Sequence, residues 1–161
     1  MRAVIQRVAS AQVSVNDKVV GEISRGLMIL LGIHKADGEN DGTWLADKTA
    51  GLRIFEDEAG KMNRSVVDLG TTPEFAGPIA RSTVLVVSQF TLVASTRKGN
   101  RPSFNDAAPP DLAITLYEFF LRTLANRLGR PVAAGIFGAT MKVTLVNDGP
   151  VTVILDSHSR E

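Results

Sequence analysis

The chain of 161 residues contains no cysteine, only two histidines, one tryptophan and one tyrosine. Without cysteine it has no thiol nucleophile, iron–sulfur cluster, cysteine zinc site or disulfide scaffold, and it suits a reducing compartment. Two histidines are too few for a histidine-rich metal cage. We therefore expect no metal, no cofactor and a cytoplasmic location.

An excess of charge and a long hydrophobic run are also missing. The 18 Lys and Arg residues nearly balance the 17 Asp and Glu residues, so any nucleic-acid contact must come from a local patch. The longest apolar runs, near 27–33 and 83–87, fall far short of the ~20 residues of a membrane span. No signal-peptide hydrophobic block opens the chain. The length fits one soluble domain, 1–161, with no membrane partner.

Apolar patterning predicts mainly strands. We expect helices over 41–51 and 110–128, the second with one apolar stripe and an end at Gly129. A surface loop covers Gly70 to Ser82. Because strands outnumber helices and do not alternate with them, the pattern favours an α+β fold with a mostly antiparallel, barrel-like sheet and two main helices. The predicted strands are 2–8, 12–15, 19–23, 27–33, 53–56, 83–92, 141–146 and 151–155.

The usual catalytic motifs are absent. The sequence has no Gly-x-Ser-x-Gly elbow, no Walker loop and no Gly-x-Gly-x-x-Gly. His34 ends an apolar strand and is expected to be structural, whereas His158 lies in a polar tail and is expected to be merely exposed. These observations argue against a Ser-His-Asp hydrolase.

Two short segments allow both a structural and a functional interpretation. Ser-Gln-Phe-Thr at 88–91 ends a very apolar strand, which either becomes polar on leaving the core or delivers N–H groups and hydroxyls to a cleft. Gly149-Pro150 lies between two predicted strands. It is either a simple turn or a cis peptide bond that fixes the direction of a carbonyl.

A third segment is basic. Arg97, Lys98 and Arg101 precede Phe104 within eight residues. Such a loop is either only solvated or holds the phosphates and bases of a single-stranded nucleic-acid end, with its cations and a stacking ring.

Together these segments resemble the D-aminoacyl-tRNA deacylase family, also called D-tyrosyl-tRNA deacylases. The resemblance covers essentially the whole chain, and the loop Gly70 to Ser82 is longer than expected for a compact bacterial member. Its hallmarks are Ser-Gln-Phe-Thr-Leu at 88–92 and Asn-Asp-Gly-Pro-Val-Thr at 147–152, supported by residues 1–8, 53–55, 60–63 and 99–104.

The resemblance implies a homodimer that removes D-amino acids from tRNA. Gly149 and Pro150, joined by a cis bond, would reach into the partner's site, where their carbonyls face the α-hydrogen of a D-residue and exclude an L side chain. Many D-residues, and also glycyl-tRNA, should then be accepted. The substrate end is the aminoacylated 3′ end of tRNA, bound by Arg97, Lys98 and Arg101.

No histidine, cysteine or carboxylate pair is placed to act as a base, so we assign the chemistry to the 88–91 segment and the RNA. Backbone N–H groups around Phe90 and Thr91 would form an oxyanion hole, at roughly 3 kcal/mol per donor. Ser88 and Gln89 would position the substrate, and the neighbouring 2′-hydroxyl would assist water. Alternatively Thr91 is a nucleophile, although it lacks an adjacent base.

Further alternatives remain open at the level of the sequence. Phe90 and Phe137 would pack on the terminal adenine, although core packing explains Phe137 equally well. The whole protein could also be a non-catalytic RNA-binding module that uses its basic loop, or a hydrolase of the same fold that clears a mischarged L-residue. Turnover of an ester would distinguish an enzyme from a binding module, and the chirality of the accepted ester would distinguish a deacylase for D-residues from a hydrolase for L-residues.

Overall fold

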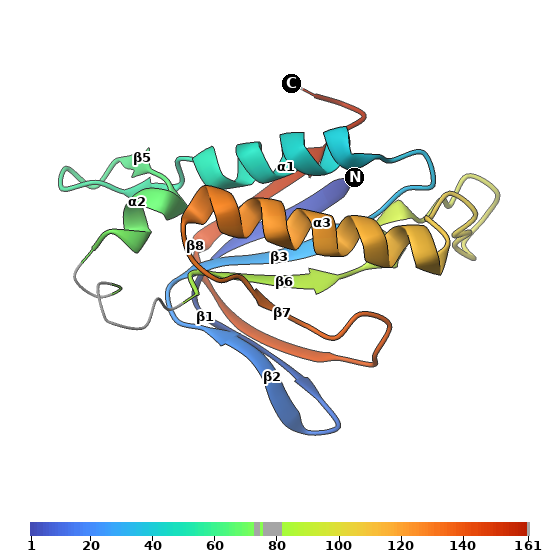
Figure 1. The fold of residues 1–161 in the computed structure, drawn as a ribbon, viewed down its shortest axis with the longest axis horizontal. Helices are drawn as coiled ribbons and strands as arrows, with labels where there is room; N and C mark the ends of the chain where they lie inside the picture. Colours follow the sequence, from blue (N-terminus) through green and yellow to red (C-terminus); the bar gives the residue numbers. More distant parts are fainter. Residues whose placement is uncertain (73–74, 76–81, 161) are drawn as a thin grey trace.

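The computed structural model describes residues 1–72, 75 and 82–160, and Figure 1 shows their arrangement. A curved sheet is covered on one face by helices, and a separate small hairpin lies beside them. The strands are β1 (Arg2–Val15), β2 (Lys18–Ile23), β3 (Gly26–Gly32), β4 (Phe55–Glu56), β5 (Met62–Arg64), β6 (Val84–Ser88), β7 (Ala133–Ala134) and β8 (Lys142–Asp156). The helices are α1 (Glu39–Gly51), α2 (Val66–Gly70) and α3 (Pro110–Leu128), with a short 3₁₀ turn η1 (Phe90–Val93).

The main sheet is mixed, so the expectation of a mostly antiparallel sheet is wrong. β1 pairs antiparallel with β2, β3 and β8, whereas β6 runs parallel to both β3 and β7. The connection from β3 to β6 holds α1, the β4–β5 hairpin and α2. It is therefore long enough for the crossover that a parallel pair requires.

The barrel-like expectation is confirmed. The path β2-β1-β3-β6-β7 bends until its two edge strands meet. A Cβ atom on Gly21 of β2 would lie only 2.8 Å from the carbonyl oxygen of Ala134 of β7, so only glycine permits this approach. The sheet therefore nearly closes on itself between β2 and β7, which protects these two edge strands.

The larger of two core clusters lies between the sheet and the two long helices, which run side by side across it (Figure 1). The smaller cluster is formed by strand residues alone. α3 follows its predicted bounds, and Gly129 ends it with a positive φ of 64°. Leu116, Phe120 and Leu124 are buried on one stripe of α3 against Leu45 of α1 and the sheet. No helix in the described part of the chain has the length and hydropathy needed to cross a membrane.

Several element boundaries differ from the predictions. The strands expected at 2–8 and 12–15 form the single strand β1, and those expected at 141–146 and 151–155 form the single strand β8. The helix α2 and the short strands β5 and β7 were not predicted, so the described residues form three helices rather than two. The predicted loop Gly70 to Ser82 lies largely outside the described residues.

Candidate functional site

A cavity of about 480 Å³ opens where β3 and β6 end. Its polar side chains come from Ser88 and Gln89, and its aromatic ones from Phe90 and Phe137. The structure thus brings four of the predicted site residues together. The remaining lining is apolar or glycine: Leu31, Ile33, Val87, Ala107, Ala108, Pro110, Ala113, Gly138, Ala139, Met141 and Val143.

The segment 88–91 changes direction at this cavity. β6 ends at Ser88, where the expected strand would have continued to Leu92, and the chain turns into η1. The backbone N–H of Gln89 donates to the Leu31 carbonyl at 2.8 Å, which is the last hydrogen bond between β6 and β3. In a 3₁₀ turn the first N–H groups have no acceptor within the turn. The backbone N–H groups of Phe90 and Thr91, at the start of η1, therefore have no hydrogen-bond acceptor within this turn.

Thr91 lies beside the cavity but does not line it. Its hydroxyl accepts a hydrogen bond from the Gln89 side-chain amide at 2.5 Å. Because Gln89 is a donor in this contact and cannot take a proton, the contact supplies Thr91 with no general base. The geometry gives the nucleophile alternative no support.

Phe137 occupies a position that serves both the cavity and the core. Its ring lines the cavity and also packs against Tyr117 of α3, with ring centroids 5.7 Å apart. The buried Tyr117 hydroxyl donates to the Val86 carbonyl at 3.0 Å, and the Gly135 amide donates to the same oxygen. Tyr117 therefore connects β6 to the segment that carries Phe137, a role the sequence did not indicate.

Burial raises the pKa of Tyr117 to about 12 from its ordinary 10.0. Above pH 10 the unfolded chain ionises this phenol first, so stability should fall by up to about 1.4 kcal/mol per pH unit until about pH 12. Tyr117 is the only tyrosine, so tyrosinate absorbance in an alkaline titration reports this group alone. Tyr117→Phe should lose this slope relative to wild type. A midpoint near pH 10 in the folded protein would contradict the prediction.

The Asn147–Thr152 motif interrupts the regular pairing of β8 with β1. Gln6 pairs with Thr152 and Val8 pairs with Asn147, so residues 148–151 face Arg7 alone and form a bulge. The Gly149–Pro150 peptide bond is cis, as the functional interpretation expected. Both residues are exposed, and neither lines the cavity of its own chain.

A buried arginine forms hydrogen bonds to this bulge. Arg7 is only 5% exposed, and its guanidinium donates to the carbonyls of Asp148 at 3.0 Å and Ile54 at 2.6 Å. The Asn147 side-chain amide also donates to the Arg7 carbonyl at 2.9 Å. The sequence analysis missed Arg7. Ala3, Ile5 and Arg7 occupy alternate, buried positions of β1, and a charged residue at a buried strand position indicates a specific polar partner.

The predicted basic residues lie on an exposed loop. Ser95 and Ser103 exchange two backbone hydrogen bonds of 2.8 Å, which close the loop that carries Arg97, Lys98 and Arg101. All three side chains are exposed, and none lines the cavity. None of the three forms an ion pair within the described ranges 1–72, 75 and 82–160.

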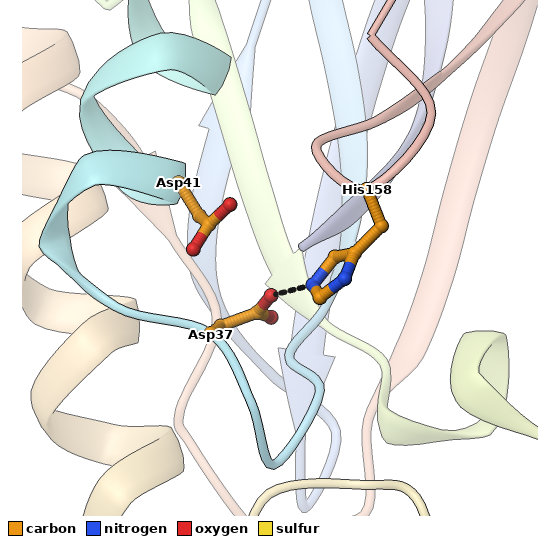
Figure 2. Close-up of side chains that lie close together, drawn as sticks. All are labelled: Asp37, Asp41 and His158. Carbon is orange, nitrogen blue, oxygen red and sulfur yellow. Dashed lines mark hydrogen bonds and ion pairs between the residues drawn. The ribbon is translucent and has the colours of Figure 1, made fainter.

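A second polar cluster, shown in Figure 2, joins Asp37, Asp41 and His158. Asp37 is fully buried, and its Oδ1 lies 2.5 Å from the Met1 ammonium and 2.6 Å from His158 Nε2. Its Oδ2 accepts from the His34 amide at 2.6 Å. His158 is therefore paired rather than merely exposed, which corrects the expectation from its polar tail.

Asp41 is also committed to internal contacts. Its burial alone would raise the pKa of the carboxyl, but hydrogen bonds from the Gly38 amide, Ser157 and Arg160 outweigh burial and lower that pKa. Although the three ligand atoms lie close enough to share a metal ion, the Met1 ammonium already supplies the positive charge. The arrangement is that of a structural clasp between both ends of the chain and the residues before α1.

Comparison with known proteins gives consistent matches. The model of the family described as D-Tyr-tRNA(Tyr) deacylase matches residues 4–156. A relative from Opitutus terrae named D-aminoacyl-tRNA deacylase is 60% identical over 161 residues, 100% of both chains. One of the same name from Geobacter sulfurreducens is 54% identical over 99% of this chain and 97% of its own.

Solved structures share the fold. A structure titled "c-Myc DNA Unwinding Element Binding Protein" is 39% identical with a TM-score of 0.84, over 97% of this chain and 98% of the other. A second is titled as a structural analysis of a probable eukaryotic D-amino acid tRNA deacylase. It has a TM-score of 0.78 over 96% of this chain and 97% of the other, but at 18% identity it supports the fold alone.

Proposed function

Because the chain belongs to the D-Tyr-tRNA(Tyr) deacylase family, we propose that it hydrolyses the ester bond of D-aminoacyl-tRNA and releases tRNA and the free D-amino acid. The full-length similarity to relatives of that name carries the proposal. The cavity at the end of β6 supports it, because an apolar chamber with few polar groups suits a small acyl group and a nucleoside.

The catalytic assignment rests on the residues at the cavity. Backbone N–H groups of Phe90 and Thr91 stabilise the tetrahedral oxyanion, while Ser88 and Gln89 position the ester and Phe137 contacts the terminal adenine. The vicinal 2′-hydroxyl of the RNA assists the attacking water. Arg97, Lys98 and Arg101 hold phosphates near the 3′ end, since such contacts contribute affinity rather than chemistry.

Chirality is selected by backbone from a second copy of the chain. We propose a homodimer in which the carbonyls of Gly149 and Pro150 reach the partner's cavity and meet the α-hydrogen of a D-residue. The exposed bulge above Arg7 supports this role, because it is held rigidly yet serves no cavity of its own chain. Glycine has no side chain to clash, so glycyl-tRNA is also a substrate. Sedimentation velocity measures the dimer directly.

D-tyrosyl-tRNA should be hydrolysed about 100-fold or more faster than L-tyrosyl-tRNA, equivalent to a steric clash of about 3 kcal/mol. Initial rates of ester loss, with buffer blanks for both esters, make the comparison. Pro150→Ala, measured in parallel on folded protein, should lose activity or discrimination. Preference for the L-ester would instead indicate an editing hydrolase of the same fold.

A nucleic-acid-binding function without catalysis is the second candidate. One structural relative carries a DNA-binding title, and the exposed cationic loop suits such a role. The same assay separates the two, since a binding module should not accelerate ester loss above the buffer rate.

A further inference from the structure

Two exposed phenylalanines touch one another at the surface. The chain has seven phenylalanines, one tryptophan and one tyrosine, all among the residues that the structure describes. Of these nine side chains only Phe90 and Phe104 are exposed, at 58% and 37%. Their ring centroids lie 5.1 Å apart with the planes at 67°, an edge-to-face contact. Large aromatic side chains are mostly buried in folded proteins. Two exposed phenylalanine rings in contact therefore indicate a surface that binds a partner.

This pair lies at the mouth of the cavity. Phe90 is itself part of the cavity lining. The Phe104 carbonyl accepts a hydrogen bond from the Ala107 amide at 3.0 Å, and Ala107 and Ala108 also line the cavity. The Ala108 amide donates to the Ile33 carbonyl at 2.9 Å. The backbone that carries Phe104 is therefore fixed relative to the cavity.

The loop that leads into Phe104 is cationic. Phe104 directly follows the Ser95–Ser103 closure of the loop that carries Arg97, Lys98 and Arg101. The nearby carboxylate of Asp106 is neutralised by Lys35, whose Nζ lies 2.7 Å away. A cationic loop beside exposed rings favours single-stranded nucleic acid over an apolar protein surface, because bases stack on rings while cations bind phosphates.

We propose that Phe104, in edge-to-face contact with Phe90, is a stacking platform for the unpaired base next to the esterified terminal nucleotide. This inference rests on the proposed function. It gives the cavity a second recognition element that acts on substrate binding and not on the chemical step. Phe104 is thus a positioning residue, and its π face rather than its bulk is what matters.

The test compares Phe104→Leu, which keeps apolar volume, with Phe104→Trp, which keeps a stacking face. For D-tyrosyl-tRNA, Phe104→Leu should raise KM about 10-fold with kcat unchanged, and Phe104→Trp should restore the wild-type KM. With the D-tyrosyl ester of adenosine, which lacks the neighbouring base, all three proteins should behave alike. Met62→Leu is the matched control, since Met62 is 53% exposed on the β4–β5 hairpin, at the opposite end of the molecule (Figure 1).

Binding of a short single-stranded RNA, measured as Kd, keeps the two proposals distinguishable. Wild type that binds this RNA more tightly than Phe104→Leu but cleaves neither D-ester would overturn the proposed hydrolysis and leave the platform supported. Equal Kd values for wild type and Phe104→Leu would overturn the platform, whatever the activity. So would a Phe104→Leu defect that is equally large with the adenosine ester or is not restored by tryptophan.

Discussion

Asp37→Asn should lower the free energy of unfolding by roughly 3–5 kcal/mol, the usual cost of removing one partner from a buried ion pair. The Met1 ammonium and the Asp37 carboxylate are both fully buried and lie 2.5 Å apart. Asparagine would leave the ammonium without its counter-charge. It would also weaken the hydrogen bonds that Asp37 accepts from His158 and from the His34 amide.

Urea unfolding at matched protein concentration measures this change, with the m value as a check that the unfolded reference is the same. Asp47→Asn is the matched control. Asp47 pairs with Arg127 at 2.5 Å, but both side chains are 49% exposed, so its loss should cost no more than about 1 kcal/mol. Equal losses in the two variants would show that the clasp contributes nothing beyond an ordinary surface pair.

The clasp also illustrates what sequence patterning cannot show. Asp37 follows β3, whereas its partners Met1 and His158 come from the two ends of the chain. No helix or strand periodicity connects these positions, so the sequence alone does not distinguish His158 from the other polar residues of the C-terminal segment. Only the antiparallel pairing of β1 with β8, which places Arg2 opposite Asp156, brings both ends to the loop before α1.

Local patterns predicted the elements that depend on local chemistry. The helix at 110–128 was predicted with its correct bounds, because its apolar stripe and the glycine that ends it are consecutive in the sequence. Strand direction depends instead on the path between strands. The continuous apolar run at 27–33 was correctly predicted to form a strand, β3, but nothing in that run specifies that its neighbour β6 is parallel.

The candidate site divides in the same way. The 88–91 segment was singled out because polar residues follow a very apolar strand, and it does open into the cavity. The sequence could not decide whether Phe137 packs in the core or lines the site, and in the structure its ring both packs against Tyr117 and lines the cavity. Tyr117 was missed because a tyrosine in an apolar helical stripe is ordinary core, and its hydroxyl acquires a role only from the Val86 carbonyl in the packed fold.

Replacing the terminal 2′-hydroxyl of D-tyrosyl-tRNA by hydrogen, with the amino acid esterified at the 3′ position, should slow hydrolysis about 100-fold or more. Within the described chain, the residues that line the cavity include no Asp, Glu, His, Lys or Arg, so no ionisable side chain there can take a proton from water. A positioned general base contributes typically about 100- to 10,000-fold. If the RNA supplies that assistance, its removal should cost at least the lower figure.

Single-turnover rates with saturating enzyme isolate the chemical step from binding. Thr91→Ala, assayed on the unmodified substrate, supplies the opposing test. Under RNA assistance it should retain substantial activity, because the Thr91 side chain does not line the cavity and its hydroxyl only accepts from Gln89. An unchanged rate with the 2′-deoxy substrate, together with complete loss in a folded Thr91→Ala, would transfer the chemistry to Thr91. The reverse pattern would leave the protein to hold the ester and its oxyanion while the substrate's own hydroxyl directs the water.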